Sequence, residues 1–236
     1  MDPDAGRRHP PGAEDTNSGL SAVAAIIPIG PGDRSWRGLL GQLERLAPDL
    51  QRRLVFAHGD LQARPRDSKI SWTESSRGRA RQQNAGAAAL DHAWLWFLHA
   101  DSRLTQETLD ALRSFLASKT DALGYFDLRF ADDGPLLMRL TEWGVRLRCR
   151  CAGLPFGDQG LLMRRERFYE LGAFDESLAF GEDHALVWAA HRSGLPVLRI
   201  PAPITTSARK YAERGWFATT WHHQRLTWQQ ALRERG

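Results

Sequence analysis

Residues 94–101 read WLWFLHAD, and this stretch decides how the rest of the sequence is interpreted. Trp94 to Leu98 is an unbroken apolar run, which is typical of a strand buried in a parallel sheet. His99 and Asp101 follow directly, where such a strand would reach the edge of its sheet. In sheets of this kind, ligands bind beyond the carboxyl ends of the strands. We therefore expect His99 and Asp101 to lie at a binding site.

Strand and helix patterns alternate on both sides of this run, which predicts an α/β fold with a mainly parallel, Rossmann-like sheet flanked by helices. The alternation within residues 123–130 is more typical of an exposed or antiparallel strand. The predicted strands are residues 21–29, 54–57, 70–73, 94–98, 123–130, 159–163 and 197–200. The predicted helices are residues 36–46, 79–90, 105–118, 135–150, 165–171, 182–193 and 211–233.

Composition limits the class of protein. The chain has 236 residues, 42% of them hydrophobic, with 32 Lys and Arg against 28 Asp and Glu. A charged fraction of 25% together with nine Trp excludes a disordered or collagen-like chain. Residues 1–19 are rich in Pro and Gly and contain no apolar run, so we expect a disordered extension before a single domain over residues 20–236. No run reaches the roughly 18 apolar residues of a membrane-spanning helix, and the two cysteines build no disulfide framework. A cytoplasmic location is therefore expected.

Charge is concentrated at the end of the chain. Residues 205–236 hold six positive and two negative side chains, which equals the net charge of +4 of the whole chain. A nucleic-acid-binding protein more often has a basic face across its fold, so we expect no nucleic-acid partner. The helix predicted at 211–233 carries Phe217, Trp221 and Trp228 on one face. Packing on the domain is the first interpretation of this face, and peripheral contact with the inner face of the membrane is the alternative.

Polar residues that could carry chemistry gather at the ends of predicted elements. A carboxylate such as Asp101 can bind a hard divalent cation, and it can equally begin a turn that leads into a helix. Arginine side chains at a helix start suit a diphosphate, although an arginine-rich helix face is often simply solvated. Acidic residues at a helix start can act as a general base or only complement the helix dipole. Besides His99 and Asp101, the candidates are Arg79, Arg81, Asn84, Asp158, Gln159, Glu182 and Asp183.

The order and spacing of five segments resemble the family 2 glycosyltransferases with a GT-A fold. The segments are GRARQQNAGAAAL at 78–90, WLWFLHADSRL at 94–104, LPFGDQGLLMRRERFYELGAFDE at 154–176, GEDHAL at 181–186 and TSARKY at 206–211. Within that family they look like the bacterial subfamily labelled arsenosugar-biosynthesis or radical-SAM/selenodomain-associated transferases. The resemblance extends from about residue 22 to residue 207.

The resemblance implies a role for each matching residue. Asp101 matches the last acid of the family's Asp-x-Asp-like metal site for Mn²⁺ or Mg²⁺, with His99 at its first position. Asp183, in the pair Glu182–Asp183, matches the catalytic base of inverting members. The remaining matches are Asp158 and Gln159 in the acceptor-side loop, and Pro28, Asp60, Arg79, Arg81 and Asn84 at the nucleotide.

Three positions depart from the family pattern. Pro28 is followed by IGPGD where the family has a Pro-x-x-Asn-Glu-like sequence, and residues 57–60 read AHGD in place of an Asp-Gly-Gly-Ser-like turn. The usual Gly-Gly-Phe is GAF at 172–174. The half of the sequence that would carry the catalysis therefore matches the family better than the half that would read the nucleoside.

The function that the resemblance implies is transfer of a sugar, with inversion and with the help of a divalent metal. The donor would be a nucleotide-diphosphate sugar, and the acceptor a small molecule or a lipid-linked alcohol. The alternative is a non-catalytic nucleotide-sugar-binding or membrane-associated protein with a degenerate GT-A fold, which the altered turn at 57–60 favours.

Overall fold

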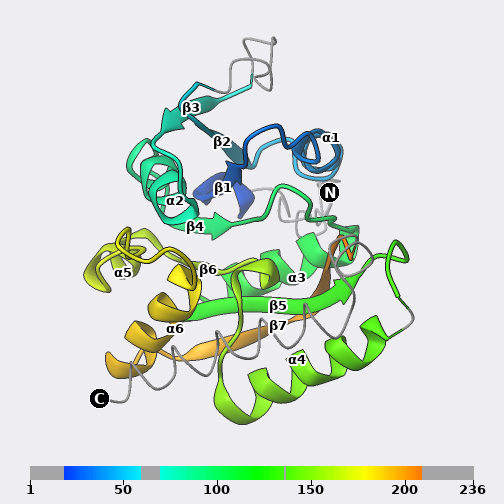
Figure 1. The fold of residues 1–236 in the computed structure, drawn as a ribbon. Coiled ribbons are helices and arrows are strands. Elements are labelled where there is room, and N and C mark those ends of the chain that lie inside the picture. Colours follow the sequence, from blue (N-terminus) through cyan, green and yellow to red (C-terminus); the bar gives the residue numbers. More distant parts are fainter. Residues whose placement is uncertain (1–18, 60–69, 136, 209–236) are drawn as a thin grey trace, which may run out of the picture.

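The computed structural model describes residues 19–59, 70–135 and 137–208 (Figure 1). Its centre is a seven-stranded sheet in the order β3-β2-β1-β4-β6-β5-β7. Within the described sheet, every pairing is parallel except those that β6 makes with β4 and β5. The predicted α/β class with a mainly parallel sheet is confirmed. The strands are β1 Val23–Ile29, β2 Gln51–Ala57, β3 Trp72–Ser75, β4 Trp94–Phe97, β5 Leu123–Phe130, β6 Leu162–Arg164 and β7 Val197–Thr206.

Helices cover both faces of this sheet (Figure 1). Alternate residues of each buried strand point to opposite faces, so Ala25 and Ile27 of β1 join one hydrophobic cluster while Ala24 and Ile26 join another. The first cluster includes residues of α1 and α3, and the second includes residues of α2, α4, α5 and α6. The helices are α1 Trp36–Leu46, α2 Arg79–Ala88, α3 Gln106–Ala117, α4 Met138–Ala152, α5 Arg165–Glu170 and α6 Glu182–Arg192, with short 3₁₀ turns η1 Leu20–Ala22 and η2 Gly157–Gln159.

Some predicted elements differ from those observed. The strand predicted at 159–163 begins only at Leu162, because Gln159 belongs to the turn η2. The last strand continues to Thr206, and β3 lies two residues later than predicted. Of the two alternatives for 123–130, exposed or antiparallel, the structure has the second toward β6, while β5 pairs parallel with β7 and is largely buried. It is buried because α3 and α4 cover it from opposite sides.

Helix α2 lies close against the sheet because it is built largely from small residues. Gly86 faces β1 and β2 so closely that an added Cβ would lie 2.6 Å from Ile26 Cγ2 and 2.9 Å from Val55 Cγ2. The buried amide of Gln82 donates hydrogen bonds to the carbonyl oxygens of Ile29 at 2.8 Å and Val55 at 2.7 Å. These contacts fix the position of α2, and with it the arginines near its start.

We expect Gly86→Ala to lower the free energy of unfolding by about 1–3 kcal/mol, because α2 would have to move away from both strands. Gly38→Ala in α1 is the matched control, since a Cβ at Gly38 meets no atom within 4 Å. The control should stabilise the protein by up to about 1 kcal/mol through helix propensity. Urea unfolding of the two variants measures the difference, and equal effects would show that the close packing of α2 carries no energy.

Candidate active site

The strand order reverses between β1 and β4, and this is the place where α/β sheets bind ligands. His99 and Asp101 follow β4 at this point, as the sequence predicts. Asp101 Oδ2 accepts a hydrogen bond of 3.1 Å from Thr206 Oγ1, at the end of β7. Two backbone hydrogen bonds between Arg103 and Thr205 join the same segments. The carboxylate of Asp101 is therefore oriented by a strand far away in the sequence.

Asp183 lies in the first turn of α6 and contacts the loop before β6. Its Oδ2 accepts a hydrogen bond of 2.5 Å from the backbone N–H of Gly157, and its Oδ1 accepts one of 2.9 Å from that of His184. A Cβ placed on Gly157 would lie 3.0 Å from Asp183 Oδ2 and 3.2 Å from His99 Nε2. The end of β4, the turn η2 and the start of α6 thus meet at one point, where only glycine fits without displacing a side chain.

The pKa values of the two acids of the predicted catalytic pair are shifted in opposite directions. Burial raises the pKa of Asp183, but His184, Arg79, the Gly157 amide and His99 together hold it below the usual value. Burial and the neighbouring Asp183 raise the pKa of Glu182, although Arg79 opposes them. Glu182 is only 3% exposed, and its Oε1 lies 3.3 Å from Arg79 Nη1. Asp183 is therefore the acid of this pair that carries a charge most readily.

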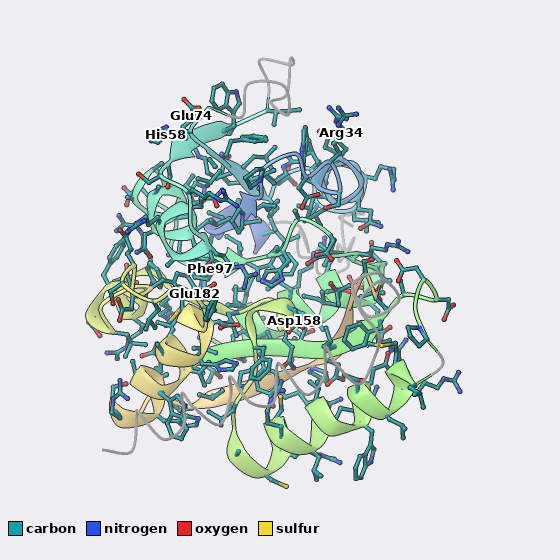
Figure 2. The ribbon with its side chains drawn as sticks, viewed as in Figure 1. Arg34, His58, Glu74, Phe97, Asp158 and Glu182 are labelled. Atoms are coloured by element: carbon teal, nitrogen blue, oxygen red, sulfur yellow. The ribbon has the colours of Figure 1, made fainter. Side chains whose placement is uncertain are left out.

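Asp158 is a third acid in this cluster. Burial raises its pKa to about 6, and so do Asp183 and Asp101, while Arg148 and Arg79 act in the opposite direction. Its Oδ1 is buried and accepts no hydrogen bond from the described residues. Figure 2 shows Asp158 and Glu182 between β4 and β5. A carboxyl group with this pKa changes its charge near neutral pH, unlike an ordinary aspartate.

Gln159 is fully engaged in holding the loop that carries Asp158. Its amide nitrogen donates to the Phe126 carbonyl at 2.9 Å, and its oxygen accepts from the Phe156 backbone N–H at 3.1 Å. The same oxygen lies 3.4 Å from both Arg148 Nη2 and Cys149 Sγ. Gln159 is 2% exposed. The predicted substrate contact by Gln159 stays a prediction, but its structural role in the loop is plain.

Arg148 is a residue of the site that the sequence analysis did not identify. Its guanidinium lies 3.3 Å from the ring centroid of Phe156 and donates through Nε to the carbonyl of Leu154 at 2.9 Å. The ring of Phe156 also stacks on His184, with 3.8 Å between centroids. In sequence, Arg148 is one of several arginines in α4, and only tertiary packing shows that it turns toward Asp158.

The three residues of α2 that are predicted to lie at the nucleotide, Arg79, Arg81 and Asn84, have different partners in the structure. Arg79 contacts the acid cluster through Glu182. Arg81 Nε lies 3.7 Å from Glu176, and the amide of Asn84 bonds to the backbone N–H and carbonyl of Phe174 as well as to Glu176. Arg81 and Asn84 therefore hold the segment 174–176, beside a hollow of about 570 Å³ between α2 and α6.

Of the two positions predicted at the nucleotide outside α2 and β4, the structure describes Pro28 but not Asp60. Pro28 is inside β1, opposite Val55 of β2, and Asp60 lies outside the described residues. His58 follows β2 and is exposed, with its backbone N–H bonded to the carbonyl of Ser75 at 2.9 Å. In Figure 2, His58 lies in the upper half of the view, well away from Asp158 and Glu182.

Few side chains near Asp101 could act as ligands of a metal ion. Among the residues that the structure describes, no group of three or more His, Cys, Asp or Glu side chains could hold a metal ion. Mg²⁺ at phosphate sites commonly takes only one or two carboxylates, with phosphate and water completing the shell. Asp101, with His99 two residues before it, fits a cation only in that shared way, together with the phosphate oxygens of a ligand.

The chain was compared with known proteins. No protein-family model matches it, and no curated protein matches it either. Among solved structures, TarS from S. aureus in complex with UDP-GlcNAc is 15% identical, with a TM-score of 0.57 over 78% of this chain and 58% of that chain. A longer TarS chain is 12% identical, with a TM-score of 0.56 over 78% of this chain and 36% of that chain. This chain thus spans well under two thirds of these TarS chains.

Glucosyl-3-phosphoglycerate synthase from Mycobacterium tuberculosis, in complex with Mn²⁺, UDP and phosphoglyceric acid, is 14% identical. Its TM-score is 0.56 over 84% of this chain and 75% of that chain. This chain has a GT-A fold. The likeness at these identities establishes the fold, and the subfamily that the sequence resembles stays a prediction. No helix within the described ranges is both long and apolar enough to span a membrane.

The raised pKa of Asp158 predicts a pH-dependent cost in stability. Its folded pKa of about 6 lies above the ordinary 3.8, so folding disfavours the ionised form, and the cost grows as pH rises from 3.8 to about 6 and stays constant above that. Asp158→Asn should therefore stabilise the protein at pH 8 by up to about 3 kcal/mol, and this gain should vanish near pH 4.

Urea unfolding at pH 8, 6 and 4 tests this expectation. Asp175→Asn is the control of opposite sign, because hydrogen bonds from Ser177 lower the pKa of Asp175 and its contribution is lost as pH falls. A loss of stability in Asp158→Asn at pH 8 would mean that its carboxylate is favourably placed in the folded state.

Proposed function

We propose that this chain is a glycosyltransferase that moves a sugar, with inversion, from a nucleotide-diphosphate sugar to a small-molecule or lipid-linked acceptor. The observation that carries the proposal is the meeting of Asp183, Asp158 and His99 around Gly157 at the strand-order reversal of a GT-A sheet. An ionised carboxylate facing a ligand crevice can accept a proton from a hydroxyl group. The UDP-GlcNAc and UDP complexes of the structural neighbours support a nucleotide-diphosphate ligand.

The leaving diphosphate would be bound from two sides. Arg79 is half exposed, so part of its guanidinium is free to reach a phosphate while it pairs with Glu182. Asp101 and His99 would hold Mn²⁺ or Mg²⁺, whose chemistry is to neutralise the charge of the leaving diphosphate. The Mn²⁺ in the glucosyl-3-phosphoglycerate synthase complex supports the use of a divalent metal. The hydrogen bond from Thr206 Oγ1 would orient the Asp101 carboxylate for that role.

Asp183 would act as the general base. The acceptor hydroxyl loses its proton to the Asp183 carboxylate while its oxygen attacks the anomeric carbon, and the bond to the diphosphate breaks on the opposite face of the sugar. Glu182, held by Arg79, would be a positioning residue. Asp158 lies in the predicted acceptor-side loop, and its buried Oδ1 is available to a hydroxyl of the acceptor.

The altered turn at 57–60 favours a second candidate, a nucleotide-sugar-binding protein that has lost catalysis. His58 is exposed after β2, where the family has an acidic turn. The two candidates differ in turnover and agree in ligand binding. Melting temperatures with and without Mn²⁺ in the presence of nucleotide diphosphates would first identify the ligand, because binding raises stability.

The variants Asp183→Asn and Asp101→Asn separate the two proposed roles. Asp183→Asn should reduce turnover by roughly 10²-fold or more, with donor binding little changed, because asparagine begins a helix equally well but cannot accept the proton. Asp101→Asn should weaken both metal-dependent binding and turnover. Single-turnover kinetics with the donor found in the melting screen measures both effects. Turnover in Asp183→Asn equal to that of the unaltered protein would remove Asp183 from the mechanism.

The pH profile distinguishes Asp183 from Asp158 as the base. With Asp183 as the base, kcat at saturating acceptor should stay level as pH falls from 8 to 5, because the pKa of Asp183 lies below the ordinary value of 3.8. Asp158→Asn should then mainly raise the KM for the acceptor. If kcat instead declines below about pH 6, the pKa of Asp158, and Asp158→Asn abolishes turnover, the base is Asp158.

A further inference from the structure

Helix α4 has apolar residues on two opposite faces. Its inner face is buried: Val145 and Cys149 belong to the second hydrophobic cluster, and Met138 packs against Phe130 and Ala208. On its outer face, Leu140 is 57% exposed, Trp143 63% and Leu147 45%. Leu137, just before the helix, is 39% exposed. A contiguous exposed apolar stripe of this kind commonly marks an interaction surface.

A row of positive charge borders this stripe. Arg139, Arg146 and Arg150 are all exposed, and at about 100° per residue they lie along one flank of the apolar residues. Glu142 is the only acid in α4, and its carboxylate accepts a hydrogen bond of 2.8 Å from the backbone N–H of Phe130, on the inner side. The outer surface of α4 is therefore apolar along its centre and cationic along one edge.

We propose that the outer face of α4 binds an anionic lipid surface. Leucine and tryptophan side chains flanked by arginines are the composition by which a helix lies flat in the headgroup region. The 15 residues of α4 extend over about 22 Å, and the stripe runs along most of this length. Figure 1 shows α4 along one margin of the molecule, away from β1, β2 and β3, so a flat surface can approach it.

Two protein segments could also cover this face: residues 209–236 of the same chain, or a second copy of the chain. Charge favours an anionic lipid surface over both. Residues 209–236 carry a net charge of +4, the same sign as the arginine row. A second copy would bring its own arginine row to the same face. An anionic membrane attracts these arginines, and its surface accepts the apolar stripe without a matching groove.

The place of α4 in the fold gives this surface a consequence for the site. The helix ends at Ala152 and leads directly into the loop that holds Asp158, and Arg148 on its inner side contacts Phe156 of that loop. Resting on the proposed function, this arrangement selects the lipid-linked class of acceptor, because the acceptor-side loop then continues from the membrane-bound helix.

Co-sedimentation of the full chain with vesicles tests the proposal without any donor or turnover, so its failure is separate from failure of the proposed function. The protein should pellet with phosphatidylcholine vesicles that contain phosphatidylglycerol, and much less with phosphatidylcholine alone. Trp143→Ser should weaken binding about ten-fold, and Arg146→Gln roughly five-fold with a smaller salt dependence. The matched controls are Leu198→Ser, 38% exposed on β7, and Arg45→Gln, exposed on α1.

Three results would overturn the proposal. The first is equal binding by Trp143→Ser and Leu198→Ser. The second is concentration-dependent self-association in sedimentation velocity that Trp143→Ser abolishes, without vesicle binding, which would assign the face to a second copy. The third is a fall of several degrees in the melting temperature of Trp143→Ser, again without vesicle binding, which would assign the face to residues 209–236.

Discussion

The hydrogen bond from the Gly157 backbone N–H to Asp183 Oδ2 joins the parts of the site that lie far apart in sequence. It closes the start of α6 onto the turn before β6, and it brings Asp158 to the same place. A buried carboxylate needs donors and positive charge around it, and Asp183 obtains them from this amide, from His184 and from Arg79. A side chain at residue 157 would press on this arrangement, because its Cβ would lie 3.0 Å from Asp183 Oδ2 and 3.2 Å from His99 Nε2.

One reversal of strand direction explains why the acids gather here. β6 is the strand of the described sheet that runs against its neighbours, so the segment before β6 begins at the same edge where β4 ends. The turn η2 is therefore carried to the point that His99 reaches from the other side. Gln159 holds this turn through bonds to β5, to α4 and to its own loop. The antiparallel direction of β6 thus brings two loops that are distant in sequence together in one site.

Much of this fold could be predicted from the sequence, and the reasons differ between elements. Runs such as 94–98 and the helical spacing of 36–46 are local patterns, and the structure has β4 and α1 there. The burial of β5 and the length of β7 depend on covering helices and on the pairing with Arg103, which local pattern does not contain. In the site, Asp101 and Asp183 follow from their places at element ends, whereas the roles of Arg148 and Gln159 arise only from tertiary contacts.

Helix α2 connects the acid cluster with strands β1 and β2, the second of which leads into the altered turn at 57–60. Over six residues its side chains contact three parts of the structure: Arg79 pairs with Glu182, Gln82 donates to carbonyls of β1 and β2, and Asn84 holds the segment that begins at Phe174. Gly86 fixes the distance of this helix from the sheet, so a shift of α2 would also move Arg79, the partner of Glu182. The turn after β2, where His58 is exposed, takes no part in these contacts. Under the proposed function, a change in nucleoside recognition would therefore disturb the acid cluster least at residues 57–60, where the sequence departs from the family it resembles.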